Sequence, residues 1–176
     1  GDDAVFDEFM QECTERGLAV LLDGVFNHVD AAHPLVEKGL AEGGWEGHED
    51  IPVLDHSKDE IKDLVTDVML HWLRRGIAGW RLDVAYSVPT WFWAQVVDRV
   101  RQRHPDAVFL GEIIHGDYIA LARESDIDTI TQYELWAGTR GSVQESNPFE
   151  LQHSLGRHAT FSKELITQTF VGNHDV

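Results

Sequence analysis

The chain has 176 residues, of which 43% are apolar, and this is typical of one globular domain rather than of a disordered chain. Its formal net charge of −17 argues against binding to a nucleic-acid backbone, which requires a basic face. The sequence contains no run of about 18 apolar residues, so we expect no membrane partner.

Cys13 is the single cysteine, so an internal disulfide is excluded and a reducing compartment is favoured. The first ten residues, GDDAVFDEFM, lack the basic and apolar segments of a signal peptide. These observations favour the cytoplasm over secretion without fixing the location.

Helices and strands are expected to alternate along the chain. Apolar spacing, together with glycine and proline positions, predicts helices over 5–17, 57–76, 89–100, 133–139 and 148–158. A capping box formed by Ser57 and Glu60 is expected to open the second of these helices. Apolar runs predict strands over 18–22, 79–83, 108–110, 127–131 and 166–171.

The first predicted strand is apolar throughout, as in a strand that is buried on both faces of a parallel sheet. Residues 30–56 are rich in glycine, and we expect them to form an inserted loop or small subdomain. The alternation predicts an α/β fold with a parallel sheet built from βαβ units. A (β/α)8 TIM barrel needs eight strands and about 250 residues, so the chain is either the middle of a barrel or a smaller open sheet.

Polar side chains lie at the ends of four predicted strands: Asp23, Arg81 with Asp83, Glu112, and Asp175. Ligands of parallel α/β folds bind at this edge of the sheet. Arg81 and Asp83 are two residues apart in one strand, so both point to the same side. A structural ion pair at a strand end explains these two residues as well as a functional pair does.

Paired carboxyl groups are the usual equipment for glycoside hydrolysis, in which one group is ionised and the other holds a proton. Arg81 favours the ionised form of Asp83. Glu112 has apolar neighbours in sequence over 110–114, and we expect a less polar setting that keeps it protonated. His28 with Asn27, and His174, bring further hydrogen-bonding groups to the same edge.

Four segments together resemble the α-amylase family of glycoside hydrolases. They are LLDGVFNH, GWRLDVAYS, LGEIIH and FVGNHDV, and their order and spacing also match. IPVLDHS loosely resembles a further signature of the family. The resemblance implies a partial TIM barrel over 1–176, with roughly barrel strands three to seven and a short inserted loop, 30–56, after strand three.

The resemblance also implies roles for the matching residues. Asp83 is similar to the nucleophile that forms a covalent glycosyl intermediate, and Glu112 to the general acid/base. Asp175 is similar to the third acid, which binds sugar hydroxyls, and Arg81 to the arginine that orients the nucleophile. The implied reaction is retaining hydrolysis or transglycosylation at α-glucosidic bonds of α-glucans, maltooligosaccharides or related sugars.

Four further points follow from the resemblance. His28 and His174 match histidines that contact the sugar, and Asp23 matches a mainly structural aspartate. Asn27 matches a residue that binds calcium in many amylases, but the other calcium ligands are not identifiable, so no metal is assigned. Tyr86 and Ser87 depart from the lysine and histidine that are common in the family, which leaves the bond specificity open.

Two other functions fit parts of the pattern. A metal-dependent hydrolase would use His28, His174, Asp83 and Asp175 as ligands, although the sequence has no His-x-His pair. A non-catalytic amylase-like barrel would bind sugar without cleaving it, but such relatives typically lose acids that are present here. An inactive fragment that lacks barrel strands and serves as a binding or scaffold subunit is the other form of this alternative. An open barrel also exposes sheet edges, and this predicts self-association of the isolated chain.

Overall fold

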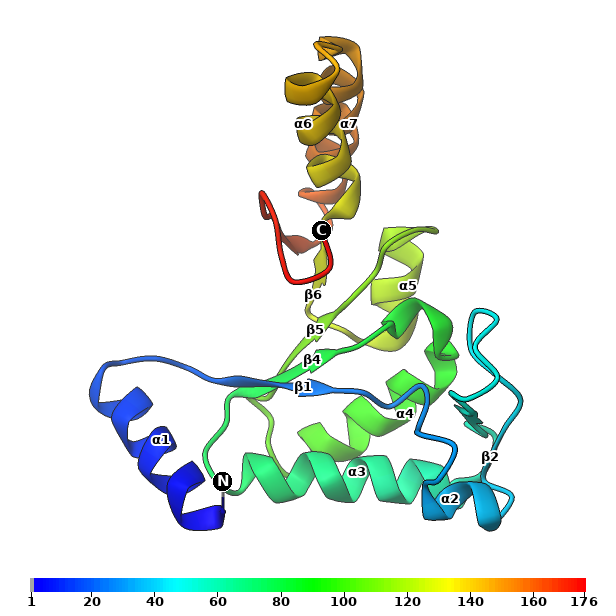
Figure 1. Cartoon of the computed structure of the whole chain (residues 1–176). Coiled ribbons are helices and arrows are strands. Elements are labelled where there is room, and N and C mark those ends of the chain that lie inside the picture. The colour runs from blue at the N-terminus through cyan, green and yellow to red at the C-terminus, as the bar shows by residue number, and fades with distance from the viewer. Residues whose placement is uncertain (1) are drawn as a thin grey trace.

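The computed structural model describes residues 2–176, and its centre is a five-stranded parallel sheet with strand order β1-β4-β5-β6-β7 (Figure 1). Consecutive parallel strands lie side by side, as they do in the wall of a (β/α)8 barrel. The structure therefore confirms the predicted α/β class and the partial barrel. The strands are β1 (Leu21–Gly24), β4 (Gly79–Leu82), β5 (Val108–Gly111), β6 (Thr129–Thr131) and β7 (Ile166–Gln168).

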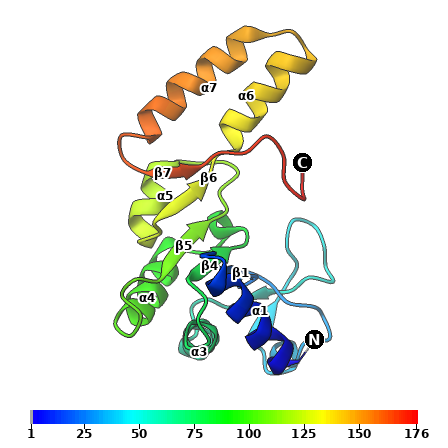
Figure 2. The same ribbon diagram turned by 90° about the vertical axis from the view of Figure 1, so that its left-hand side faces the viewer.

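Helical segments connect the strands of this sheet, and one further helix precedes β1 (Figure 2). The longer helices are α1 (Asp3–Glu15), α3 (Asp59–Leu73), α4 (Thr90–Arg101), α5 (Tyr118–Ser125), α6 (Tyr133–Gln144) and α7 (Pro148–Phe161). No helix within residues 2–176 combines the length and the apolarity needed to cross a membrane.

The hydrophobic core lies between the sheet and helices α3, α4 and α5. Trp80, Leu82 and Phe109 alternate with other residues along their strands and join this core. Arg81 points to the opposite face of β4, away from the core, because side chains alternate along a strand. The alternation thus separates the apolar packing from the charged residues at the strand ends.

The segment between β1 and α3 contains a short helix, α2 (Pro34–Glu37), and an antiparallel pair, β2 (Ala41–Glu42) and β3 (Val53–Leu54). The sequence predicted only an irregular insertion here. A backbone hydrogen bond folds the segment back toward the end of β1, since Leu54 N–H donates at 2.9 Å to the carbonyl of Asn27, three residues after that strand.

Two sequence-based expectations are wrong in detail, and one helix was not predicted. The capping box fails because Asp55 accepts hydrogen bonds from the backbone N–H of Ser57 at 3.0 Å and from its hydroxyl at 2.5 Å. Helix α3 instead begins after Lys58, which makes no side-chain cap. Strand β1 is not buried on both faces, because it ends the sheet and Leu21 is 38% exposed. Helix α5, which Asp117 caps, was not predicted.

Helices α6 and α7 form an antiparallel pair that projects away from the rest of the molecule (Figures 1 and 2). Both helices extend further than predicted, and α6 continues through Gly138 and Gly141. A side chain at Gly138 would collide with Ser154 of α7, and one at Gly141 would collide with the Glu150 carboxylate. The glycines therefore allow a close approach of the two helices rather than ending α6.

Candidate active site

Four of the predicted residues meet at the carboxyl ends of β1, β4 and β5. Asp23 and Arg81 are register partners in neighbouring strands. Arg81 Nη1 lies 2.8 Å from Asp23 Oδ1 and 2.6 Å from Asp83 Oδ1. Arg81 Nη2 lies 2.8 Å from Glu112 Oε1. One guanidinium group therefore joins three carboxylates that the sequence separates by up to 89 residues, from position 23 to position 112.

The Arg81 side chain is 16% exposed, so neighbouring side chains rather than water balance most of its positive charge. Burial lowers the pKa of Arg81, but hydrogen bonds to Asp23 and Asp83 and the negative charge of Glu112 outweigh burial and raise it overall. Arg81 thus stays cationic and orients three carboxylates at once.

Glu112 is 3% exposed, and donors reach both of its carboxylate oxygens. Oε1 forms an ion pair with Arg81 Nη2 at 2.8 Å and accepts a hydrogen bond from the Tyr133 hydroxyl at 3.1 Å, whereas Oε2 accepts from the Val84 backbone N–H at 2.8 Å. The expectation of a less polar setting is therefore wrong for the side chain. Sequence neighbours of Glu112 are apolar, but its surroundings come from β4 and α6.

The backbone turns sharply after Asp83 and brings a donor to Glu112. Val84 has a φ of 39°, in the left-handed region that a β-branched residue rarely adopts. Burial of Val84 and its N–H bond to Glu112 hold this conformation. Strained backbone of this kind concentrates at functional sites, and here it joins the strand that carries Asp83 to the second carboxylate.

Tyr133 is a site residue that the sequence analysis missed. It is the first residue of α6, directly after β6, and it is 6% exposed. Its hydroxyl lies 3.1 Å from Glu112 Oε1, 3.4 Å from Asp175 Oδ2 and 2.9 Å from Asn173 Nδ2. Burial raises the pKa of Tyr133, the Asn173 bond lowers it, and the Glu112 and Asp175 charges raise it. Its position at a strand's carboxyl end is the signal that would have identified it.

The predicted residues after β7 are the most exposed part of the site. The side chains of His174 and Asp175 are 71% and 47% exposed, and His174 Nε2 lies 3.4 Å from Asp175 Oδ2. Asn173 Oδ1 accepts from the backbone N–H groups of Asp175 and Val176 at 3.0 and 3.1 Å. The link between Asp175 and the other carboxylates is the Tyr133 hydroxyl, which lies within hydrogen-bonding distance of both Asp175 and Glu112.

His28 lies on the side formed by the inserted segment and stacks on Trp45 with a ring-centroid separation of 4.8 Å. From the same segment, Glu46 accepts a hydrogen bond from the Tyr86 hydroxyl at 3.2 Å. Burial, followed by the Glu46 charge, raises the pKa of Tyr86 to about 12. Tyr86, one of the two positions that depart from the family pattern, is thus linked to the inserted segment through its hydroxyl.

Asn27 is a candidate calcium ligand because it is 1% exposed and its Oδ1 has no hydrogen-bond partner. A carboxamide oxygen suits calcium, but calcium takes about six to eight oxygen ligands. Within residues 2–176, no three His, Cys, Asp or Glu side chains gather as a metal site. One donor does not define a calcium site, and the metal-hydrolase alternative gains no support from the arrangement of its four candidate ligands.

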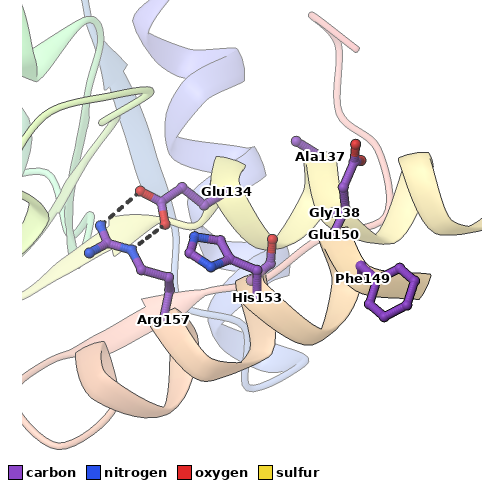
Figure 3. A pocket seen from close by; sticks show the side chains of 8 residues that line it. Glu134, Ala137, Gly138, Phe149, Glu150, His153 and Arg157 are labelled. Atoms are coloured by element: carbon purple, nitrogen blue, oxygen red, sulfur yellow. Dashed lines mark hydrogen bonds and ion pairs between the residues drawn. The ribbon is translucent and has the colours of Figure 1, made fainter. Parts of the chain in front are cut away.

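A separate groove lies between α6 and α7, where Arg157 forms a two-pronged ion pair with Glu134 at 2.9 and 3.0 Å (Figure 3). Phe149 and His153 also line this groove. None of its lining residues belongs to the carboxylate cluster, and this groove is therefore distinct from the candidate active site.

Comparisons with known proteins agree with the geometry. The family model described as alpha amylase, catalytic domain, matches residues 45–176. An intracellular maltogenic amylase of Bacillus subtilis is 31% identical over 139 residues, which cover 66% of this chain and 24% of the relative. Neopullulanase 2 of Thermoactinomyces vulgaris is 33% identical over 141 residues, which cover 65% of this chain and 24% of the relative.

Solved structures show the same architecture. An Anoxybacillus alpha-amylase superposes with a TM-score of 0.84 at 25% identity and covers 100% of this chain and 44% of its own. A cyclomaltodextrinase superposes with a TM-score of 0.85 at 24% identity and covers 99% of this chain and 35% of its own. The chain thus spans about a quarter of the length of these curated relatives and less than half of the solved structures.

Proposed function

The chain belongs to the alpha-amylase catalytic-domain family, and from this premise we propose that it carries the catalytic centre of a retaining enzyme that cleaves or transfers α-glucosidic bonds. The observation that carries the proposal is the Arg81 guanidinium, which contacts both Asp83 and Glu112. Retaining enzymes need their two carboxyl groups about 5–5.5 Å apart. Two carboxylates on one guanidinium are compatible with that short separation.

In the proposed mechanism, Asp83 attacks the anomeric carbon while Glu112 gives its proton to the departing glycosidic oxygen. The sugar is then bonded to Asp83, and the leaving sugar is a neutral alcohol. Glu112, now a carboxylate, removes a proton from water or from an acceptor sugar, which displaces Asp83. Hydrolysis and transglycosylation differ only in this acceptor.

The other residues bind and orient in this mechanism. Arg81 orients Asp83 through their ion pair, and Asp175, His28 and His174 bind sugar hydroxyls. Asp23 supports Arg81 from the neighbouring strand. The substrate class rests on the relatives, which are named as a maltogenic amylase, a neopullulanase and a cyclomaltodextrinase.

The test compares Glu112→Gln with wild type on two substrates. On a maltooligosaccharide we expect a loss of about 10²- to 10⁴-fold, the usual contribution of general acid–base catalysis. Formation of the glycosyl intermediate should suffer less with a nitrophenyl α-glycoside, because its leaving group needs no proton. Azide should restore turnover and yield the α-glycosyl azide, since it attacks the intermediate without a general base.

Glu134→Gln is the matched control, because Glu134 pairs with Arg157 outside the carboxylate cluster. Its activity should remain at the wild-type level. Unchanged activity in Glu112→Gln would overturn the assignment of Glu112, and a β-configured first product from wild type would overturn the retaining mechanism. Glucan binding without turnover by wild type would favour the non-catalytic alternative.

The location and the association state remain predictions. The Bacillus subtilis relative is named as intracellular, which agrees with the cytoplasmic location that a lone cysteine favours. Self-association through the open sheet is tested by sedimentation velocity over a range of protein concentrations.

A further inference from the structure

Tyr133 connects two candidate site carboxylates that come from different parts of the chain. Glu112 follows β5 and is buried, whereas Asp175 lies in the half-exposed segment after β7. Of residues 2–176, Tyr133 is the one whose side chain hydrogen-bonds to both of them. Its ring packs edge-on against Phe170 at 4.9 Å and against Trp136 at 6.3 Å, so the hydroxyl is held in place.

The hydroxyl of Tyr133 has one hydrogen to donate and three neighbours. Asn173 Nδ2 can only donate, so the phenolic oxygen accepts from it at 2.9 Å. The hydroxyl hydrogen is then directed either to Glu112 Oε1 at 3.1 Å or to Asp175 Oδ2 at 3.4 Å. A single hydrogen cannot serve both carboxylates fully at the same time.

We propose that Tyr133 is a positioning residue that couples Glu112 to Asp175 by presenting its one hydroxyl hydrogen to the carboxylate that needs it. When Glu112 has given up its proton, the hydroxyl donates to Glu112. When Glu112 is protonated, the hydroxyl turns to Asp175 and holds that side chain toward the sugar. This inference rests on the proposed function, because it assigns Glu112 as the acid/base.

Among the groups that face Glu112, Tyr133 is the one that can change its hydrogen-bond partner. Arg81 from β4 is a fixed cation, and the Val84 N–H is a fixed backbone donor. Tyr86 feels the negative charge of Glu112, but its hydroxyl donates to Glu46. The Tyr133 hydroxyl is neutral and can rotate about its C–O bond, so it alone can change partner as Glu112 gains and loses its proton.

The kinetic test compares Tyr133→Phe with Tyr118→Phe in the full-length protein. Tyr118 is also a buried tyrosine, but its hydroxyl donates to the Ile114 carbonyl rather than to a carboxylate. For Tyr133→Phe we expect kcat/KM to fall about tenfold to a hundredfold, because a hydrogen bond to a charged group is lost. Because Asp175 would no longer be held toward the sugar, KM should rise by a larger factor than kcat falls.

The pH profile separates positioning from a structural role. Loss of the donor to Glu112 should move the alkaline limb of the kcat/KM profile to higher pH by up to about one unit. Tyr118→Phe should leave that limb unmoved. A Tyr133→Phe profile identical to that of Tyr118→Phe would overturn the proposal.

A second measurement needs no catalysis. The ¹³Cζ signal of Tyr133, identified by its loss in Tyr133→Phe, is followed up to about pH 12. Because the Glu112 charge contributes to raising the pKa of Tyr133, Glu112→Gln should lower it. Glu134→Gln is the control, because Glu134 pairs with Arg157 rather than with the Tyr133 hydroxyl, and it should leave the pKa of Tyr133 unmoved. No response of Tyr133 to Glu112→Gln would overturn the coupling.

The two readouts distinguish failure of this inference from failure of the proposed function. If Tyr133 responds to Glu112→Gln but no α-glucoside is turned over, the coupling stands and the proposed function fails. If Glu112→Gln abolishes turnover but Tyr133→Phe behaves as Tyr118→Phe does, the function stands and the inference fails.

Asn173→Asp provides a second variant if Tyr133→Phe does not fold. It retains an acceptor for the backbone N–H of Asp175 and Val176 but loses the donor to Tyr133. The new carboxylate competes for the Tyr133 hydroxyl hydrogen, so the alkaline limb should again move to higher pH. An unmoved limb in this variant would contradict the proposal.

Discussion

Two regions of the molecule are stabilised in different ways. Around β4 and β5, the core-facing apolar side chains of the sheet and of α3 and α4 are buried, and Phe92 and Phe109 have 0% exposure. The α6–α7 pair leaves Phe149 76% exposed and relies on close helix packing at Gly138 and Gly141. The candidate site draws Glu112 from the first region and Tyr133 from the start of α6. Its integrity therefore depends on two regions of unequal stability.

The largest difference in the free energy of unfolding should appear when one phenylalanine side chain is removed from each region. Phe109→Ala deletes a fully buried ring of β5 and should lower the free energy of unfolding by about 3–5 kcal/mol. Phe149→Ala removes a mostly exposed ring of α7 and should change it by less than about 0.5 kcal/mol. Urea unfolding of both variants measures the contrast, and equal losses would show that the α6–α7 pair has an apolar core after all.

A pair of glycine substitutions tests the packing within the α6–α7 pair. Gly138→Ala places a methyl group against Ser154 and should destabilise by about 1–3 kcal/mol through overpacking, less the gain in helix propensity. Gly156→Ala in α7 meets nothing within 4 Å and should stabilise by up to about 1 kcal/mol. Thermal unfolding followed by circular dichroism shows whether each variant is more or less stable than wild type. Stabilisation by Gly138→Ala would refute close packing.

The smallest expected effect is a pH dependence that belongs to the buried region. His56 is 6% exposed, and burial lowers its pKa below 6.5, although a hydrogen bond to the Phe26 carbonyl acts the other way. Protonation therefore favours the unfolded state, so stability is full above about pH 6.5 and falls as the pH drops below that value.

His56→Gln should flatten this dependence, since glutamine does not titrate in this range. Urea midpoints measured from about pH 5 to 8 would show the change. His153→Gln in α7 is the control, because His153 is exposed. An unaltered slope in His56→Gln would mean that another group causes the dependence.

Much of the fold and the carboxylate cluster was predictable from the sequence, and particular residues show why. Apolar runs marked the strands, and Asp23, Asp83 and Glu112 marked their carboxyl ends, which a parallel sheet brings to one edge. Tyr133 was missed because a tyrosine at a helix start looks like ordinary core. Its partners lie 21 and 42 residues away in sequence, so only the tertiary structure brings them together.

Local signals failed where a competing interaction took over. Ser57 has the sequence of a helix cap, but the Asp55 carboxylate takes both its N–H and its hydroxyl hydrogen. The predicted helix stopped at residue 139, before Gly141, whereas α6 continues through Gly141 because the neighbouring helix approaches closely there. Single-residue preferences are weaker than a nearby charged acceptor or a tertiary contact.

The sharing of Arg81 among Asp23, Asp83 and Glu112 has an electrostatic consequence. Asp175 is a fourth carboxylate at the site. Even when Glu112 is protonated, the single positive charge of Arg81 cannot balance the charges of Asp23, Asp83 and Asp175. The negative potential that remains attracts positive charge and repels anions. Protonated nitrogen analogues of a sugar ring should therefore bind here more tightly than their neutral counterparts, and phosphorylated sugars should bind more weakly.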